Sequence, residues 1–216
     1  MSARLPCAVA LILLGTGCTF VGQGEGEVTS DALYAPTCWF GAYDLDPTFF
    51  ATVPFRDEQQ VRVQRGSDLV EVSDGVAIQI NDVPDIRANQ LGQALDVGLP
   101  LQLLKEVDPS ITNAPDPLVS LALYLQFSCH NQNIVLYAID GTITFDALFS
   151  GDPNESEGSE KLTDARFEVT LADPRDAILE GTPRQGNISV PAEKTSTLNG
   201  WFRFNFQRGQ PGQPFP

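Results

Sequence analysis

Residues 118–129, Leu-Val-Ser-Leu-Ala-Leu-Tyr-Leu-Gln-Phe-Ser-Cys, carry the clearest structural signal in the sequence. Their odd-numbered positions are apolar, namely Val119, Leu121, Leu123, Leu125, Phe127 and Cys129. The other face carries Ser120, Tyr124, Gln126 and Ser128. Successive side chains of a strand point to opposite sides, so this alternation predicts a β-strand with one buried face.

The chain after the polar residues 130–133 repeats this pattern at Val135, Tyr137, Ile139, Ile143, Phe145 and Phe149. We expect residues 135–149 to form the antiparallel partner of 118–129. Asp140-Gly141 interrupts the run and is a hairpin signal. The phase of the alternation is unchanged across it, which one long strand also requires, so both readings stay open.

Shorter stretches with β-branched, aromatic or alternating residues extend the prediction along the chain. The further expected strands are 38–43, 48–55, 61–63, 76–80, 99–103, 165–171, 187–190 and 200–208. Residues 88–95 predict at most a short turn of helix, because Gly92 interrupts them. Nine or more strands with little helix predict an all-β protein, an antiparallel β-sandwich over residues 28–208 followed by an irregular tail, 209–216. A membrane barrel is disfavoured by the long, irregular loops.

The first residues have the organisation of an export signal. Arg4 precedes the apolar run 8–14, which ends in Gly15-Thr16-Gly17 before Cys18. The run is about half the length of roughly 20 residues that a membrane-spanning helix needs. We therefore expect residues 1–17 to be a cleaved signal peptide.

The small residues before Cys18 resemble the lipobox of bacterial lipoproteins, in which the cysteine carries a diacylglycerol after cleavage. Gly15 departs from the pattern, because an aliphatic residue usually stands there. The resemblance implies lipidation at Cys18, and Thr19, which is not Asp, implies an outer-membrane location in the cell envelope. Residues 18–27 would be the lipidated cysteine and a flexible Gly-rich tether. A secreted or periplasmic soluble protein is the alternative.

The chain is acidic, with 28 Asp and Glu against 13 Lys and Arg and a net charge of −15. Loss of Arg4 with the leader would bring the charge to −16. Such a surface repels nucleic acid and anionic lipid headgroups, so we expect no nucleic-acid partner. The expected partners are a membrane, through the anchor, and a protein or glycan of unknown kind.

Two cysteines, Cys38 and Cys129, remain after the leader and Cys18. Each falls in the apolar phase of its expected strand, and exported proteins usually oxidise such pairs. We therefore predict a Cys38–Cys129 disulfide. His130, the only histidine, follows Cys129, but an oxidised cysteine cannot serve as a nucleophile for it to activate.

No stretch carries a recognisable catalytic or cofactor motif. Gly22, Gly24 and Gly26 are spaced like a phosphate loop but lack the preceding strand and following helix. No pair of carboxylates stands out among the 28 acids. Oxygen ligands for Ca²⁺ occur at Asp44 and Asp46, and at Asp173, Asp176 and Glu180, but turn formation accounts for such Asp residues equally well. We expect no metal and no cofactor.

Three aromatic residues, Trp39, Tyr43 and Trp201, fall opposite the core residues of their strands and are candidates for a ligand surface. Taken together, the sequence favours a membrane-tethered, non-catalytic binding or cell-envelope structural module. The alternative is a carboxylate-dependent hydrolase of envelope polysaccharide, which needs two acids facing each other across a groove.

Overall fold

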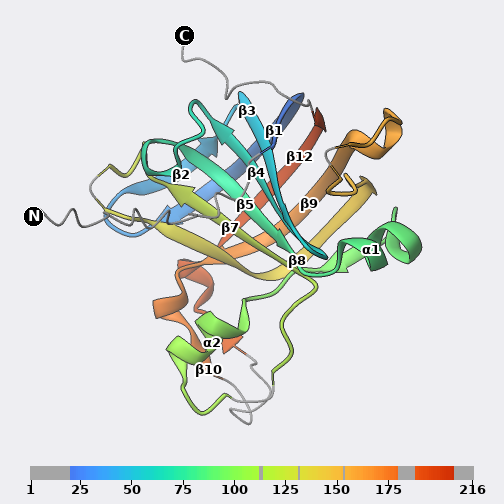
Figure 1. The fold of residues 1–216 in the computed structure, drawn as a ribbon. Coiled ribbons are helices and arrows are strands. Elements are labelled where there is room, and N and C mark those ends of the chain that lie inside the picture. Colours follow the sequence, from blue (N-terminus) through green and yellow to red (C-terminus); the bar gives the residue numbers. More distant parts are fainter. Residues whose placement is uncertain (1–19, 112–113, 131, 153, 180–187, 207–216) are drawn as a thin grey trace, which may run out of the picture.

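The computed structural model describes residues 20–111, 114–130, 132–152, 154–179 and 188–206 (Figure 1). Their strands are β1 (Phe20–Ala35), β2 (Trp39–Asp44), β3 (Phe49–Phe55), β4 (Glu58–Arg65), β5 (Asp74–Ile80), β6 (Ala94–Asp96), β7 (Val119–Leu125), β8 (Val135–Ala147), β9 (Leu162–Ala172), β10 (Ile178–Leu179), β11 (Ile188–Ser189) and β12 (Ser196–Phe206). Their helical segments are α1 (Val83–Asp85), α2 (Leu101–Val107), the π-helical turn η2 (Ile86–Gln90), and the 3-10 turns η1 (Val70–Val72), η3 (Ser159–Lys161), η4 (Pro174–Asp176) and η6 (Ala192–Lys194).

Eight of these strands form one closed antiparallel sheet (Figure 1). They neighbour one another in chain order from β1 through β3, β4, β5, β7, β8 and β9 to β12, and β12 then pairs with β1. The antiparallel all-β class is therefore confirmed, but the sheet closes on itself instead of dividing into the two stacked sheets of a sandwich. The alternation that we used specifies one buried face per strand, and a barrel and a sandwich both satisfy it.

Three smaller features decorate the barrel. β2 pairs with the second half of β1, beyond the part that pairs with β3, so that β2 and β3 follow the same edge of β1. β6 pairs with β8 at residues 142–144, beyond the part of β8 that pairs with β7, and its Leu95 joins the core; β10 and β11 form a separate two-stranded ribbon. Beside β8, α2 packs its Leu104 in a small apolar cluster with Tyr137 and Ile139.

The closing seam between β1 and β12 depends on glycine. Three glycines of β1 lie directly opposite three phenylalanines of β12, as the pairs Gly22 with Phe206, Gly24 with Phe204 and Gly26 with Phe202. A Cβ atom on Gly24 would come within 2.3 Å of the Phe204 Cβ. The stretch that we predicted as a tether is thus the first strand of the barrel from Phe20 onward, and its glycines make room for aromatic rings.

The core lies inside the barrel and draws on all eight closing strands. Phe202 and Phe204 are fully or almost fully buried, and the Phe204 ring stacks on Phe50 with centroids 5.7 Å apart. On β7 the predicted apolar face from Val119 to Leu125 is buried, as expected. The strand ends there, however, and the following turn leaves Phe127 65% exposed, so its predicted place in the core is wrong.

Two other local predictions are resolved by the backbone. β8 runs through Asp140-Gly141 as one strand, and an irregularity in its pairing with β9 falls between Ala138 and Asp140. Before it the even positions Leu136 and Ala138 are buried, so the predicted core phase of Val135, Tyr137 and Ile139 is wrong. Residues 99–103 are not a strand, because α2 begins at Leu101, and the Pro100 carbonyl accepts the backbone N–H groups of Leu103 and Leu104 in its first turn.

Candidate functional site

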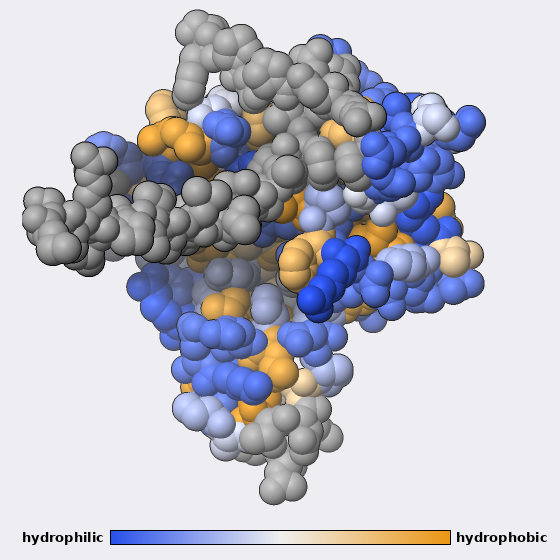
Figure 2. Space-filling view, in the orientation of Figure 1, coloured by the Kyte–Doolittle hydropathy of each residue, from blue (hydrophilic) through white to orange (hydrophobic). Residues whose placement is uncertain are grey.

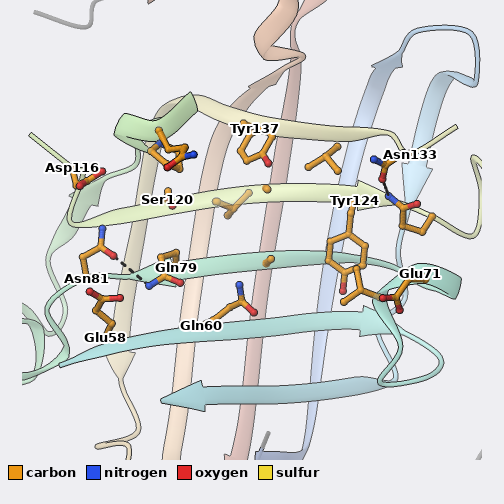
Figure 3. Close-up of a pocket in the computed structure, with 18 residues that line it drawn as sticks. Glu58, Gln60, Glu71, Gln79, Asn81, Asp116, Ser120, Tyr124, Asn133 and Tyr137 are labelled. Atoms are coloured by element: carbon orange, nitrogen blue, oxygen red, sulfur yellow. Dashed lines mark hydrogen bonds between the residues drawn. The ribbon is translucent and has the colours of Figure 1, made fainter. Parts of the chain in front are cut away.

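An open groove of about 920 Å³ crosses the outer wall of the barrel over β4, β5, β7 and β8 (Figure 3). Its floor consists of outward-facing residues of these strands, since their alternate residues fill the core. Pro100, Gln102 and Asp116, from α2 and the segment before β7, bound one end of the groove. Glu71, in the loop between β4 and β5, lies at the other end (Figure 3).

The groove is hollow because small residues occupy the middle of its floor. Ala77 of β5 pairs directly with Ala122 of β7, and both line the groove. Larger side chains flank this alanine pair, with Tyr124 on β7 and Tyr137 on β8 (Figure 3). The half-buried Tyr137 ring and the apolar floor beside it offer a surface on which a flat or ring-shaped ligand could pack, whereas Tyr124 is only 4% exposed.

Amide side chains dominate the polar lining: Gln60, Gln79, Asn81, Gln102, Gln126 and Asn133. Several of them are held in place by hydrogen bonds. The Gln79 amide nitrogen donates to Asn81 Oδ1 at 3.3 Å, and the Asn81 amide nitrogen donates to the Pro117 carbonyl at 2.7 Å. An amide both donates and accepts, so such a lining suits ligands that do the same.

The charge of the lining has one sign. It contains Glu58, Glu71 and Asp116, and none of the described residues that line it is Lys, Arg or His. Asp116 is oriented by the Leu101 backbone N–H, which donates to its Oδ1 at 3.0 Å. Glu58 and Asp116 lie on opposite sides of the same end of the groove, and Glu71 lies at the far end (Figure 3). An anionic ligand is therefore disfavoured in this groove.

Tyr124 is the most firmly held of the lining side chains. Its hydroxyl donates to Gln64 Oε1 at 2.5 Å, and the Gln64 amide nitrogen donates in turn to the Ser67 carbonyl. Burial raises the pKa of Tyr124 well above its ordinary value. Burial and the charge of Glu106 also raise the pKa of Tyr137. Both phenols are thus neutral at physiological pH.

No family model matches the chain, and no match was found among curated proteins or among solved structures. Conclusions about function therefore rest on the residues of this chain and their arrangement. In the ranges that the structure describes, no helix combines the length and the apolar character needed to cross a membrane.

The structure does not gather the three predicted aromatic site residues at one place. Trp39 and Tyr43 contact each other edge to face, with ring centroids 5.5 Å apart, but Tyr43 is only 5% exposed. Trp201 pairs with Glu27, eight residues along β1 from Ala35, the partner of Trp39. Eight residues of strand span about 26 Å. Trp201 borders a separate, shallower hollow on β1 and β12.

The predicted disulfide between Cys38 and Cys129 is confirmed, with Cα atoms 5.6 Å apart. The turn before Cys129 is fixed by Asp74, which is buried. Asp74 Oδ1 accepts the backbone N–H groups of Phe127 and Ser128 at 3.0 Å, and the Ser128 hydroxyl donates to Oδ2. With Cys129 oxidised, His130 has no thiol beside it to activate. Cys18 lies outside the described residues, so its lipidation stays a prediction.

The acids considered as calcium ligands serve other roles where the structure describes them. Asp173 forms an ion pair with Arg175, whose hydrogen bonds hold the pKa of Asp173 below its ordinary value. Asp176 accepts a hydrogen bond from Lys194 at 2.6 Å. Glu180 lies outside the described residues. Within the described ranges no three residues among His, Cys, Asp and Glu cluster as a metal site would require.

Sequence reasoning missed the groove, because its residues belong to strands that are far apart in the sequence. One signal was present: the positions between the core residues of 58–62 and 76–80 include Gln60 and Gln79 rather than the Lys and Glu of an ordinary solvated face. Only the order of the strands shows that these amides lie on the same wall as Ser120.

Proposed function

We propose that this protein is an exported, lipid-anchored binding module whose groove takes a neutral glycan of the cell envelope. The observation that carries the proposal is the lining of the groove, whose described residues combine amides, carboxylates and the partly exposed Tyr137 ring without any basic side chain. Sugar hydroxyls donate and accept hydrogen bonds, as the amides do, while carboxylates accept from them. The apolar faces of sugar rings pack on aromatic side chains.

The size of the groove supports the same ligand class. Small-molecule sites usually enclose about 300–1,000 Å³, and this groove, at about 920 Å³, is at the upper end of that range. It is open to solvent on its outer side, so it could hold a short segment of a sugar chain. Binding along an open wall suits a module that holds a polymer, and the acidic lining would exclude phosphorylated or uronic-acid polymers.

The anchoring half of the proposal rests on the sequence of the leader. An apolar run followed by Gly15-Thr16-Gly17-Cys18 resembles a lipobox, and Thr19 favours the outer membrane. A further support is the disulfide between Cys38 and Cys129, since such bonds persist in oxidising compartments.

The binding proposal is tested by filling the floor of the groove. Ala122→Leu adds a side chain between the two tyrosines without reaching the core, and Ala42→Leu adds the same side chain on exposed β2, away from the groove. We expect calorimetric titration with neutral envelope oligosaccharides to show binding by the wild type and by Ala42→Leu. Ala122→Leu should lose at least about tenfold in affinity, about 1.4 kcal/mol.

Two results would contradict this proposal. The first is wild-type protein that binds no neutral oligosaccharide, and the second is an Ala122→Leu variant that binds as tightly as wild type. Either would show that the groove is not a glycan-binding site. Release of reducing ends during the titration would instead establish the hydrolase alternative. In that case Glu58→Gln and Asp116→Asn, at opposite sides of one end of the groove, should each abolish the release.

The anchor is tested separately on protein isolated from its native membrane. Mass spectrometry of the mature N-terminus should find a diacylglycerol on Cys18, and Cys18→Ala should move the protein to the soluble envelope fraction. An unmodified N-terminus in soluble protein would refute the anchor and leave glycan binding unaffected.

A further inference from the structure

We infer that the tip of the β3–β4 hairpin, with Phe55 and Arg56, docks into the headgroup layer of the membrane that holds the anchor. This inference rests on the proposed lipidation of Cys18 and adds to it a second, protein-borne membrane contact. Its partner is a lipid surface with little net charge, because the acidic chain repels an anionic one.

The position of the hairpin follows from the register of the first strand. Phe20, where β1 begins, pairs with Thr52 of β3 in antiparallel direction. From that pair, the chain toward Cys18 and the chain toward Phe55 leave the barrel at the same end. Cys18 is two residues from Phe20, which is at most about 7 Å of chain.

The hairpin reaches at least as far as the anchor can. Phe55 lies three residues beyond Thr52, which corresponds to about 10 Å of extended strand. A lipid on Cys18 therefore cannot hold the barrel end farther from the membrane than the hairpin projects. With no long tether between the lipid and β1, the barrel can stand with this end against the headgroup layer. The tip of the hairpin then reaches that layer beside α1 and the start of the β8–β9 connection.

The side chains at the tip suit such an interface. Phe55 is 64% exposed, and the Arg56 guanidinium lies over its ring, 5.2 Å from the centroid. An aromatic ring beside a long cationic side chain is a combination that enters the boundary between headgroups and acyl chains, where the cation stays among the phosphates. Arg56 has φ of 58°, so it sits at the turn itself.

The hairpin is braced rather than free. Its ladder runs without interruption from Phe49 with Gln64 to Phe55 with Glu58. The Val83 backbone N–H donates to the Asp57 carbonyl at 2.8 Å, which ties the tip to α1, the neighbouring helical turn in Figure 1. A rigid tip loses little conformational freedom on docking, and this favours even a small contact.

The opposite end of the barrel supplies a matched control. Phe40 of β2 is 68% exposed, close to the value for Phe55, and it pairs with Tyr34 near the end of β1. On the face of the molecule that Figure 2 shows, hydrophobic residues are scattered among hydrophilic ones, so exposure alone does not mark a membrane contact. We therefore expect Phe55 to contact the membrane and Phe40 to stay in solvent.

The test uses full-length lipidated protein reconstituted into vesicles of phosphatidylethanolamine and phosphatidylcholine with brominated acyl chains. Phe55→Trp and Phe40→Trp each add a tryptophan to Trp39 and Trp201, and their fluorescence is compared with that of the wild type. The emission contributed by Phe55→Trp should shift to shorter wavelength and be quenched by the brominated lipid. The emission contributed by Phe40→Trp should be neither shifted nor quenched.

Each other outcome overturns the inference in a recognisable way. If mass spectrometry finds the lipid on Cys18 and the Phe55→Trp signal is not quenched, the hairpin does not dock and the anchor stands. Equal quenching of both variants would show that the barrel lies on its side. If Cys18 carries no lipid, the anchor proposal fails and the docking inference fails with it.

Discussion

Adding one methyl group at Gly24 should open the seam of the barrel. In Gly24→Ala, the new Cβ would lie 2.3 Å from both the Arg203 carbonyl oxygen and the Phe204 Cβ, and 2.7 Å from the Phe204 Cα. Two of these atoms are backbone, so a side-chain rotation cannot relieve the contact. Either β1 and β12 must separate locally or Phe204 must leave its buried position.

The size of the effect follows from three contributions. Crowding a close-packed site costs about 1–3 kcal/mol. Partial exposure of the Phe204 ring, now 1% exposed, would add up to about 3 kcal/mol. Replacing a strand glycine by alanine otherwise gains about 0.5–1 kcal/mol. We expect a net loss of about 2–4 kcal/mol in the free energy of unfolding and a fall in melting temperature of about 5–15 °C.

Urea denaturation followed by circular dichroism measures this loss. Gly158→Ala is the control, because Gly158 has φ of −62° and a methyl group added there would meet no other atom within 4 Å. That variant should be neutral or gain about 0.4–1 kcal/mol through the unfolded chain. A Gly24→Ala protein as stable as wild type would refute the view that glycine is required at the seam.

Three further predictions concern buried groups. Tyr43→Phe should stabilise the protein by about 1 kcal/mol at pH 7, because the buried Tyr43 hydroxyl has no hydrogen-bond partner among the described residues. Burial raises the pKa of Tyr43, so above about pH 10 the tyrosine ionises in the unfolded chain but not in the folded protein. The stability of the wild type should therefore fall as the pH rises above about 10, and that of Tyr43→Phe should fall less. Thermal melts between about pH 8 and 11 measure the difference. Reducing the Cys38–Cys129 disulfide, which spans 91 residues, should lower the free energy of unfolding by up to about 4–5 kcal/mol, measured by thermal melting. Thiol titration of unfolded, non-reduced protein should find neither cysteine free. Asp74→Asn should lower the free energy of unfolding, measured by urea denaturation, by about 2–3 kcal/mol. Ser128→Ala should lower it less, because that change removes only the Ser128 hydroxyl from the carboxylate.

Alternation in the sequence predicted the strands well because it reports a local property, the burial of one face. β5 and β9 cover the stretches in which apolar residues alternate, β12 covers its stretch as far as Phe206, and β7 covers the first part of 118–129, up to Leu125. The disulfide was predictable for the same reason, since Cys129 shared the apolar phase and only Cys38 remained to pair with it. The strand predicted at residues 99–103 is wrong, because an apolar pattern of only five residues fits a strand and a helix equally well.

The closure of the barrel and the groove were not predictable, because both depend on which strands become neighbours. The glycines of 22–26 were read as linker from composition, whereas their role follows from the phenylalanines opposite them, about 180 residues later in the chain. Gln60 and Gln79 gain significance only when β4 and β5 stand beside β7. Long-range pairing is the information that local periodicity lacks.

The pairing of the first strand with the last determines when the barrel can close during synthesis of the chain. Chains emerge from the ribosome, and from a translocation channel, with the N-terminus first. One edge of β1 therefore lacks its hydrogen-bonding partner until β12, residues 196–206, has been synthesised. Glycine is a poor strand former, so the first strand has little tendency to pair with a wrong partner in that interval. The eleven residues of β12 supply the last edge, so the closed sheet can form only after residues 196–206 have been synthesised.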